Sequence, residues 1–347
     1  MRNYEGCDRR SYRLWRHRLI RLLRQHRHVS ELSVFSSSQA GMNYDDIYPH
    51  VQDIYQGVLK SVDAHQLADE YDVIFVSAPP GVAAELMEYL IDGQAKVIDL
   101  SGDFRLLDGS IYEDWYGRPA AKSSLVEKAV YGLSEWNRED IAKAKLIANP
   151  GCYPTAVLLG LAPLAHNNVI DTSTLIIDAK SGTTGAGKNP SEMTHFAEMN
   201  DSFKVYKVNQ HKHTPEIEQQ LEQWVGFKEP ITFTPHLVPM SRGIMATMYA
   251  KVDDSLTKTK VEQIYRDAYE KNTICSRNSS RYPATKEVYG SNFTNISYHL
   301  DERTGRITVI SVIDNLVKGA AGQAIQNMNL MQGFEETEGL WAMPVYP

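Results

Sequence analysis

The first part of the chain alternates between patterns typical of buried strands and patterns typical of helices. An apolar run at 71–77 ends in a proline–glycine turn, a helical stretch follows at 82–91, and a second apolar run occupies 96–100. This strand–turn–helix–strand order predicts a parallel sheet with crossover helices. Ligands bind beyond the carboxyl ends of such strands, so we expect ligand-binding loops at 77–81 and 101–105.

After residue 152 the strand patterns become longer. The runs that favour extended structure there are 174–180, 231–238, 245–252 and 306–313. They predict a second domain that is built on a mixed sheet. The last segment, 319–331, has the spacing of one amphipathic helix, and we expect it to pack back on the first domain.

Composition narrows the class of protein. A chain of 347 residues suits two domains, and its net charge of −7 argues against a general nucleic-acid binder. No apolar run reaches the roughly 18 residues that a membrane span needs. Cys7, Cys152 and Cys275 are far apart, which fits a reducing, cytoplasmic compartment better than a disulfide framework or a zinc site. We therefore expect no metal, no nucleic acid and no membrane partner.

One cysteine lies at a sharp turn. Asn149-Pro150-Gly151 follows an apolar run, and a helical pattern with proline in its first turn begins around Cys152. A cysteine there faces unpaired backbone N–H groups and the positive end of the helix dipole, which lower the pKa of its thiol. Spacing alone leaves two interpretations open: a reactive thiolate, or a small buried hydrophobic residue.

A glycine-rich segment, 181–188, follows one of the predicted strands. Gly182, Gly187 and Lys188 nearly match a phosphate-binding P-loop, but Asn189 stands where that loop needs serine or threonine. A glycine turn that lets backbone amides approach a ligand is the better interpretation. A plain flexible loop is the alternative.

Two histidines precede a predicted helix. Thr214 can cap this helix, with Pro215 at its first position and Glu216 in its first turn. His213 then lies just before the helix N-terminus, where the dipole disfavours the imidazolium and keeps a pKa near neutrality plausible. His211 and His213 could instead bind a metal, but no third ligand lies nearby, or they could be surface histidines.

Together, six motifs in this order resemble those of the N-acetyl-gamma-glutamyl-phosphate reductases, a family related to aspartate-semialdehyde dehydrogenase. The resemblance runs from about residue 19 to the C-terminus. The motifs are Asp-Leu-Ser-Gly-Asp-Phe-Arg at 99–105, Asn-Pro-Gly-Cys-Tyr-Pro-Thr at 149–155, Ser-Gly-Thr-Thr-Gly-Ala-Gly-Lys at 181–188, His-Lys-His-Thr-Pro-Glu-Ile at 211–217, Pro-His-Leu-Val-Pro-Met-Ser-Arg-Gly at 235–243 and Asp-Asn-Leu-Val-Lys-Gly-Ala-Ala-Gly-Gln-Ala at 314–324.

The resemblance implies an enzyme of arginine biosynthesis that reduces N-acetyl-L-glutamyl 5-phosphate to the 5-semialdehyde and phosphate. The Cys152 thiolate would attack the acyl phosphate and expel phosphate, leaving a thioester that NADPH reduces. His213 would be the general acid/base, preferred to His211 because it lies beside the helix cap. Glu216 would orient His213 or the amino-acid end of the substrate.

The resemblance also assigns ligand-binding residues, each of which could instead be a local cap or a surface charge. Arg242, Arg105 and His211 would contact the substrate, the arginines through its phosphate or carboxylate. The residues expected at NADPH/NADP are Ser36 and Ser38 at the 2′-phosphate, Ser77 and Pro79 at the ribose and pyrophosphate, Asn315 at the nicotinamide amide, and Gly182 and Gly185 in the glycine loop.

The fold class that follows is α/β. A Rossmann-like parallel-sheet NADP domain, 1–149 plus 315–347, would accompany an α+β mixed-sheet domain, 150–314, for catalysis and oligomerisation. The family suggests a homo-oligomer, either dimer or tetramer. The alternative substrate is an aminoadipyl phosphate of lysine biosynthesis, which is one methylene longer.

The N-terminus departs from the family, which opens with a β-strand and a Gly-x-x-Gly-x-x-Gly turn. Arg10, Arg13 and Arg16 stand where those glycines would be, and their side chains would fill the space that the pyrophosphate needs. Skipping one base in a suitable coding sequence for 5–17 gives Lys-Val-Ala-Ile-Val-Gly-Ala-Thr-Gly-Tyr-Gly-Gly-Thr, the missing strand and turn. We therefore favour a paired frameshift as the explanation.

If the written N-terminal residues are genuine, we expect the first strand to be missing or displaced. The chain could then be a catalytically impaired binding protein on the same fold. An arginine-rich binding arm or a transit peptide is a further alternative, because residues 1–28 are rich in arginine and poor in acidic residues.

Overall fold

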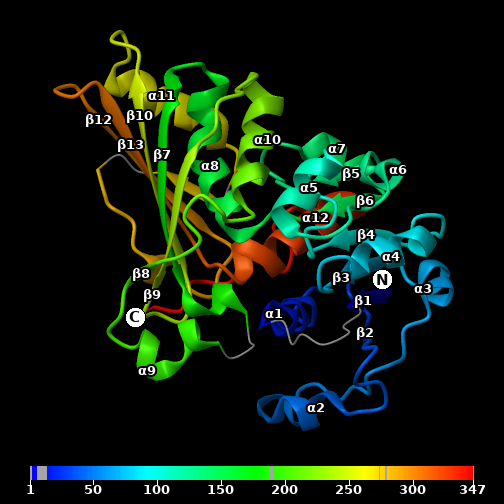
Figure 1. Ribbon diagram of the computed structural model, residues 1–347. Coiled ribbons are helices and arrows are strands. Elements are labelled where there is room, and N and C mark those ends of the chain that lie inside the picture. The colour runs from blue at the N-terminus through cyan, green and yellow to red at the C-terminus, as the bar shows by residue number, and fades with distance from the viewer. Residues whose placement is uncertain (1, 6–13, 188–190, 273, 278–279, 347) are drawn as a thin grey trace. The chain divides into compact units, whose positions relative to one another are not determined.

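The structure is a computed structural model that describes residues 2–5, 14–187, 191–272, 274–277 and 280–346. The chain divides into two compact units (Figure 1). Unit 1 joins the chain up to Pro150 with Gln323–Leu340, and unit 2 joins Gly151–Gly322 with the residues from Trp341 onward. The domain limits that the sequence suggested stay a prediction.

Unit 1 is built on a six-stranded sheet in which every neighbouring pair of strands is parallel. The strand order is β2-β1-β3-β4-β6-β5. The strands are β1 Arg2–Glu5, β2 Glu31–Val34, β3 Val73–Val76, β4 Lys96–Asp99, β5 Ala129–Tyr131 and β6 Leu146–Ala148. The predicted parallel sheet of a Rossmann-like domain is confirmed.

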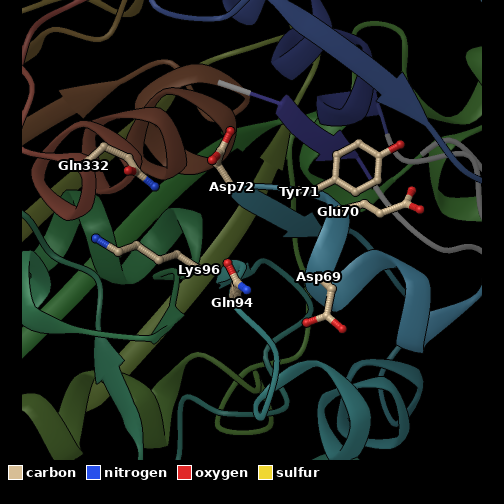
Figure 2. A pocket seen from close by; sticks show the side chains of 7 residues that line it. All are labelled: Asp69, Glu70, Tyr71, Asp72, Gln94, Lys96 and Gln332. Carbon is tan, nitrogen blue, oxygen red and sulfur yellow. The ribbon is translucent and has the colours of Figure 1, made fainter.

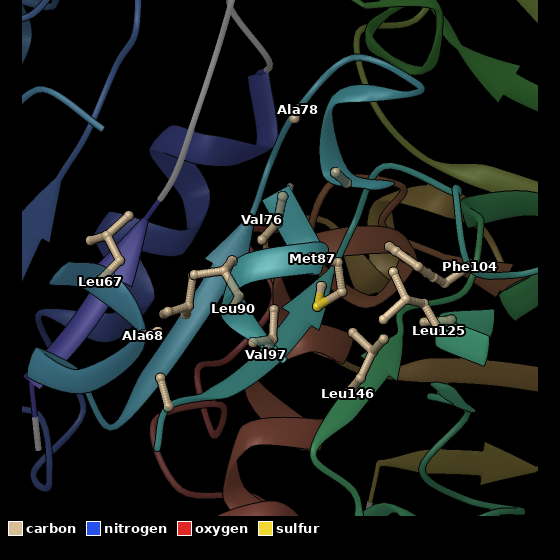
Figure 3. Close-up of a cluster of buried hydrophobic side chains, with 14 of the residues drawn as sticks. Leu67, Ala68, Val76, Ala78, Met87, Leu90, Val97, Phe104, Leu125 and Leu146 are labelled. Carbon is tan, nitrogen blue, oxygen red and sulfur yellow. The ribbon is translucent and has the colours of Figure 1, made fainter. Parts of the chain in front are cut away.

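The helices of unit 1 cover this sheet and are short. They are α1 Leu14–Leu23, α2 Tyr44–Ile47, η1 Pro49–Val51, α3 Ala64–Glu70, α4 Val82–Leu90, α5 Gly109–Tyr116, α6 Ser123–Val126 and α7 Arg138–Lys143. Met87 and Leu90 of α4 share a buried cluster with Val76 and Val97 of the sheet (Figure 3). Full burial of such a side chain contributes about 1.5–3 kcal/mol. This packing fixes the ends of β3 and β4, where the predicted ligand loops begin.

The first strand is present in the sheet. Arg2–Glu5 pairs in parallel with both β2 and β3, so the expectation of a missing first strand is wrong. Backbone N–H and C=O groups make this ladder, and every residue except proline supplies both. Arg10, Arg13 and the side chain of Arg16 lie outside the part of the chain that the structure describes.

The C-terminal helical segment differs from the single amphipathic helix that the sequence pattern predicts. Two elements replace the single helix expected at 319–331: a π-helix, η5 Val317–Ala321, and α12 Gly322–Gln332. From Gln323 to Met331 the side chains of α12 are all buried, so the expected amphipathic face is wrong. Its polar residues are satisfied internally, since Gln323 and Asn327 both donate to the Gly132 carbonyl.

Unit 2 is built on a seven-stranded mixed sheet with the order β11-β12-β13-β10-β7-β9-β8. The strands are β7 Ile170–Gly182, β8 Lys204–Val205, β9 Thr232–Val238, β10 Ile244–Val252, β11 Cys275–Arg277, β12 Thr294–Asp301 and β13 Arg306–Ile313. β7 is parallel to β9 and antiparallel to β10. The predicted mixed sheet is confirmed, together with the α/β class.

One long helix organises unit 2. α8, Cys152–His166, packs on β7, β10 and β13, with α10 Thr214–Val225 and α11 Lys258–Tyr269 beside it (Figure 1). The short helices are η2 Thr183–Ala186, η3 Glu192–Thr194, α9 Phe196–Met199 and η4 Thr285–Val288. Residues 153–165 of α8 are buried, so the packing of this helix fixes the place of the cysteine at its start.

A small cavity lies at the amino ends of the strands in unit 1, away from the predicted ligand loops (Figure 2). Its volume is about 210 Å³, and Lys96, Asp72 and Gln332 are among the residues that line it. The Lys96 ammonium donates to the Met331 carbonyl in the last turn of α12, where the helix dipole favours a cation. Lys96 therefore has a structural role at this cavity.

Candidate active site

Cys152 is the first residue of α8, where the sequence predicted the start of a helix. Gly151 precedes the helix with an extended backbone, and its carbonyl accepts the N–H and the hydroxyl of Thr155 at 2.9 Å each. The thiol residue is half-buried. Because the N-terminal end of a helix dipole stabilises negative charge, this place favours the thiolate as nucleophile.

His213 lies against the peptide that precedes the cysteine. It is buried and is the residue just before α10. A Cβ atom placed on Gly151 would lie 2.5 Å from Nε2 and 2.8 Å from Cδ2 of the His213 ring. Only glycine at 151 leaves room for this contact. The glycine of the cysteine motif thus brings an imidazole to the start of α8.

The start of α10 differs from the sequence prediction in one residue. His213 precedes the helix with helical dihedral angles, φ −84° and ψ −9°, and Thr214 is already inside it. The Thr214 hydroxyl is buried and has no hydrogen-bond partner among the described residues, so the predicted Thr214 cap is wrong. The chain enters the helix one residue earlier than a threonine cap requires.

Glu216 joins the starts of two helices. It lies in the first turn of α10, it is buried, and its Oε1 accepts the N–H of Gly151 at 2.7 Å. A carboxylate is stabilised at a helix N-terminus, and here α8 and α10 both supply one. The bond ties α10 to the residue before Cys152, so it fixes the place of His213 relative to the cysteine.

The π-helix η5 approaches the cysteine closely. A Cβ atom on Gly319 would lie 2.9 Å from the Cβ and 3.3 Å from the Cα of Cys152. The Gly319 N–H donates to the Asp314 carbonyl at 2.9 Å, which is the long-range bond of a π-turn. Gly319 is therefore required by the packing of η5 on the first residue of α8.

His211 has both ring nitrogens engaged. Its Nδ1 accepts the backbone N–H of His213 at 3.1 Å, and its Nε2 lies 3.3 Å from the hydroxyl of Tyr206. Burial, and after it the positive charges of Lys212 and Lys207, lowers the pKa of His211 to about 3. His211 is therefore neutral at physiological pH.

The glycine loop does not present its first amides to a ligand. The N–H groups of Gly182, Thr183 and Thr184 donate to the carbonyls of Gly243, Met240 and Ser241. The predicted approach of these three amides to a ligand is wrong, because a neighbouring loop already accepts their hydrogen bonds. Gly182 is required by this packing, since a Cβ atom on it would lie 2.7 Å from the backbone nitrogen of Arg242.

The other residues predicted in or beside this loop are Gly185, Lys188 and Asn315. A Cβ on Gly185 would lie 2.7 Å from Ser181 Oγ and 3.7 Å from Asn315 Nδ2, so Gly185 borders Asn315. Lys188 lies outside the described residues. Asn315 is buried, its Oδ1 accepts the N–H of Gly243 at 2.8 Å, and its Nδ2 donates to Thr184 Oγ1 at 3.1 Å. The Asn315 amide thus holds two loops together.

Arg242 is a buried cation with a fixed orientation. Its guanidinium forms an ion pair with Asp314 at 2.6 Å and lies 4.8 Å above the ring centroid of Tyr289. Asp314 also accepts the N–H groups of Gly290 and Leu316, so it is held on several sides. The Arg242 Nε is buried without a hydrogen-bond partner among the described residues, so it can donate to an anion.

Arg105 lies in unit 1 and binds the backbone. Its Nε donates to the Asn149 carbonyl at 2.8 Å, and the side chain is buried. The loop before it is held by Asp99, which accepts the N–H and the hydroxyl of Ser101. Burial, and after it the charge of Asp103, raises the pKa of Asp99 above its ordinary value. The hydrogen bond from Arg105 to the Asn149 carbonyl thus fixes the chain at the end of β6, where the cysteine motif begins.

The predicted cofactor residues of unit 1 follow the carboxyl ends of β2 and β3. Ser77 is completely buried, and its hydroxyl has no hydrogen-bond partner among the described residues. Pro79 follows in the same loop and is half-buried. The Ser36 hydroxyl accepts the N–H groups of Ser38 and Gln39, and Ser38 is exposed.

The N-terminus of α4, which follows the loop of Ser77, is already neutralised. The Asp103 carboxylate accepts the N–H groups of Gly81 at 2.8 Å and Ala84 at 3.2 Å. Gly81 has φ +90°, a conformation that suits glycine. A carboxylate thus already accepts the amides that a pyrophosphate would need at this helix end.

Unit 2 by itself gathers most of the predicted site. It contains Cys152, His211, His213, Glu216, Arg242, Asn315, Gly182 and Gly185, and unit 1 contains Ser36, Ser38, Ser77, Pro79 and Arg105. The sequence analysis missed Tyr206, which contacts His211, and Gly319 and Asp314, which contact Cys152 and Arg242. The last two lie in the recognised motif at 314–324, and Tyr206 has no motif that could have shown it.

Within the described residues, no group of three or more histidine, cysteine, aspartate or glutamate side chains is arranged to hold a metal ion. No helix among the same residues is long and apolar enough to cross a bilayer.

Two domain families match most of the chain. The semialdehyde dehydrogenase NAD-binding domain matches residues 17–144, and the semialdehyde dehydrogenase dimerisation domain matches 152–315. The N-acetyl-gamma-glutamyl-phosphate reductase of Geobacillus sp. (strain WCH70) is 54% identical over 330 residues, which cover 95% of this chain and 96% of that protein. This chain belongs to the N-acetyl-gamma-glutamyl-phosphate reductase family. Relatives of the same name from Halalkalibacterium halodurans and Bacillus subtilis (strain 168) are 55% and 52% identical, with the same coverage.

Solved structures show the same fold at low identity. Aspartate semialdehyde dehydrogenase II from Vibrio cholerae matches with a TM-score of 0.71 at 18% identity, covering 96% of this chain and 98% of that chain. Aspartate semialdehyde dehydrogenase with NADP from Candida albicans matches with a TM-score of 0.61 at 14% identity, covering 96% and 99%. The family resemblance found in the sequence is confirmed.

Proposed function

We propose that this chain reduces N-acetyl-L-glutamyl 5-phosphate to N-acetyl-L-glutamate 5-semialdehyde and phosphate, with NADPH as reductant, in arginine biosynthesis. The observation that carries the proposal is the pairing of Cys152, at the start of α8, with His213, whose ring lies on Gly151. The names of relatives at 52–55% identity over 330 residues support the substrate.

Cys152 performs the first half of the reaction. Its thiolate attacks the acyl carbon, a C–S bond forms, and the C–O bond to phosphate breaks, so that phosphate leaves and a thioester remains. The N-terminal end of α8 stabilises the thiolate before the attack. The bond from Gly151 to Glu216 keeps this helix start in place during the attack.

In the second half of the reaction, His213 acts as the general acid and then as the general base. A bound NADPH supplies the hydride that reduces the thioester carbon. His213 donates a proton to the carbonyl oxygen, which gives a thiohemiacetal on Cys152. It takes this proton back as the C–S bond breaks, which releases the aldehyde and restores the thiolate.

Arg242 holds a substrate anion. Its guanidinium is oriented by Asp314 and Tyr289, and its buried Nε remains as a donor for a carboxylate or phosphate oxygen. Arg105, whose Nε already binds the Asn149 carbonyl, gives weaker support for a substrate contact. His211 is assigned a positioning role below because both of its ring nitrogens bind the protein.

The residues at the ends of β2 and β3 fit the ribose part of a dinucleotide. The buried hydroxyl of Ser77 lacks a partner among the described residues, and Pro79 extends the same loop. Segment 35–42 contains serines and no carboxylate. NAD enzymes use an acidic residue at this place to bind the 2′-hydroxyl, so Ser36 and Ser38 favour the 2′-phosphate of NADPH.

The remaining proposed cofactor contacts are those with the nicotinamide and the pyrophosphate. Asn315, Gly182 and Gly185 border the loop that would meet the nicotinamide, but the Asn315 amide already bonds Gly243 and Thr184. It retains one N–H for a ligand. The turn that would bind the pyrophosphate corresponds to Arg10, Arg13 and Arg16, whose side chains lie outside the described residues.

The protein also forms a homo-oligomer in this proposal, either dimer or tetramer, because residues 152–315 match a dimerisation domain. Ile176 of β7, Val205 of β8 and Phe203 just before β8 are 42%, 51% and 59% exposed, which gives the sheet of unit 2 an apolar surface for a second copy. We place the enzyme in the cytoplasm because its reactive thiol requires a reducing compartment.

The proposal is tested in the reverse direction. The semialdehyde, phosphate and NADP⁺ should give NADPH, which is followed by its absorbance. Cys152→Ser should abolish this activity, whereas Cys275→Ser, at a buried cysteine of β11, should retain it. Retention of most activity in Cys152→Ser would refute the covalent mechanism.

Two further measurements separate the alternatives. The first measurement is a titration with NADPH that is followed by nicotinamide fluorescence. Saturable binding would exclude the alternative that the protein is catalytically silent because it cannot bind the cofactor. Comparison of kcat/KM for the glutamyl and aminoadipyl substrates would identify the pathway, since one methylene changes discrimination by about 1–3 kcal/mol. We expect the glutamyl substrate to be preferred.

A further inference from the structure

A chain of hydrogen bonds begins at the backbone of His213. The His213 N–H donates to His211 Nδ1 at 3.1 Å. Because Nδ1 accepts, the proton of the neutral His211 ring is on Nε2, and this nitrogen lies 3.3 Å from the Tyr206 hydroxyl. An imidazolium at His211 would place a second N–H against that of His213.

The chain continues through two tyrosines to a strand of the sheet. The Tyr206 hydroxyl donates to Tyr153 Oη at 3.3 Å, and the Tyr153 hydroxyl donates to the His236 carbonyl in β9 at 3.2 Å. At the two ends of this hydrogen-bond chain, the His213 N–H can only donate and the His236 carbonyl can only accept. Every proton between them therefore has one position, and the neutral Nε2–H form of His211 is the form that fits.

The two tyrosines lie near the cysteine. Tyr153 is the next residue in α8 and is buried. Burial raises the pKa of both Tyr153 and Tyr206, and the negative charge of Cys152 raises each further. Both hydroxyls therefore stay protonated and remain donors throughout the pH range in which the enzyme works.

The hydrogen-bond chain closes a loop with an unfavourable backbone. Between Tyr206 and His213, Lys207 has φ +48° and Asn209 has φ +56°. Residues with side chains rarely adopt this left-handed conformation, and such residues persist where the surrounding structure holds them. The Tyr206 N–H donates to the Pro235 carbonyl, which anchors this end of the loop to β9. The contact of Tyr206 with His211 then spans the loop.

We propose that Tyr206 is a positioning residue for the reaction at Cys152. It fixes His211 in the neutral Nε2–H form, and His211 in turn holds the His213 backbone so that its ring meets Gly151. His211 is accordingly a part of the support and not the acid/base. The choice of reaction in the test below rests on the proposed function, whereas the spectroscopic measurement does not.

Tyr206→Phe tests the proposal because it removes one hydroxyl and keeps the ring, whose centroid is 5.6 Å from that of His211. We expect kcat to fall between about tenfold and a hundredfold, since His213 is no longer held in place, with KM changed by less than about threefold. The matched control is Tyr265→Phe. Tyr265 is fully buried, and its hydroxyl donates to the Gly160 carbonyl of the same helix α8 at 2.7 Å.

The control should lower the melting temperature and leave kcat within about twofold of the wild type. Equal losses of kcat in the two variants would show that Tyr206 is merely structural and would overturn the proposal. If the wild type itself does not reduce the substrate, the proposed function fails, and the measurement below still decides the positioning role.

The second measurement reads the His211 ring directly by NMR of ¹⁵N-labelled histidine, with assignment by His211→Gln. We expect a neutral Nε2–H ring that does not titrate between pH 5 and 8, and an Nε2–H proton shift that changes in Tyr206→Phe but not in Tyr265→Phe. A His211 ring that titrates in this range, carries its proton on Nδ1, or is unaffected by Tyr206→Phe would overturn the proposal.

Discussion

Gly151→Ala places one methyl group between the cysteine helix and its proposed acid/base. The new Cβ would lie 2.5, 2.8 and 2.9 Å from Nε2, Cδ2 and Cε1 of His213, whereas ordinary contacts begin at 3.4 Å. The ring must therefore move by about 1 Å, and a shift of this size at a reacting group lowers a rate by up to about a hundredfold. The backbone of Gly151, with φ −67° and ψ 156°, suits alanine, so the effect isolates the contact.

The effect on stability is separable from the effect on catalysis. Overpacking of this kind costs about 1–3 kcal/mol of the free energy of unfolding. Gly160→Ala on the same helix is the matched control, because its Cβ would lie 2.6 Å from the Met248 methyl carbon, a flexible side-chain end. Steady-state kinetics and chemical denaturation are measured on both variants.

We expect both glycine variants to lose stability and only Gly151→Ala to lose kcat. The acylation of Cys152 by the acyl phosphate should persist in Gly151→Ala, because the thiolate and its helix remain. If Gly151→Ala retained kcat within about twofold while its melting temperature fell, the contact of His213 with the cysteine motif would have no role in turnover, and the reasoning would be refuted.

Three other predictions concern pH, the substrate anion and the N-terminus. Because burial and then Lys212 and Lys207 lower the pKa of His211 from 6.5 to about 3, the unfolded chain binds a proton that the folded chain does not. The free energy of unfolding should therefore fall as pH falls from 6.5 towards 3, by on the order of 3 kcal/mol. This pH dependence should be shallower in His211→Gln. Equal slopes in the two proteins would contradict the prediction. Arg242→Lys should lower kcat/KM at least about tenfold, since lysine cannot reproduce a stacked, forked cation, and unchanged kcat/KM would remove Arg242 from the site. Resequencing of the source gene should show a one-base gain near codon 5 and a one-base loss near codon 18. If the arginines are genuine, they should weaken NADPH binding by about 2–4 kcal/mol. Peptides that match the written residues 5–17, together with normal NADPH affinity, would therefore contradict the frameshift.

Periodicity and turn chemistry were sufficient to predict a parallel and a mixed sheet, but not the strands β1, β5, β8, β11 and β12. β3 of unit 1 is apolar and buried on both faces, and β10 of unit 2 alternates between buried and partly exposed residues, which are the patterns of a buried parallel sheet and a half-covered mixed sheet. The C-terminal helix could not be predicted in the same way. Gln323 and Asn327 look like a polar face in the sequence, but both are buried on the Gly132 carbonyl, and only the tertiary structure supplies that partner.

The site was predictable where a residue's role depends on its neighbours in sequence. Cys152 at a helix start follows from the turn before it and the helix after it. The role of Gly182 depends on a partner far along the chain, the loop 240–243, whereas Tyr206 lies five residues before His211 and reaches it across an irregular loop. No local pattern shows either contact, so the pairing of the first three amides of the glycine loop was not foreseen and the tyrosine was missed.

The central claim is a covalent thioester on Cys152, and trapping it is the most direct test. The enzyme without NADPH is mixed with the acyl phosphate, quenched in acid and digested for mass spectrometry, while released phosphate is measured in parallel. We predict about one phosphate per active site and an N-acetylglutamyl group on the peptide that contains Cys152, with neither in Cys152→Ser. Turnover with NADPH but no acyl group on that peptide, or an acyl group on another residue, would contradict the account.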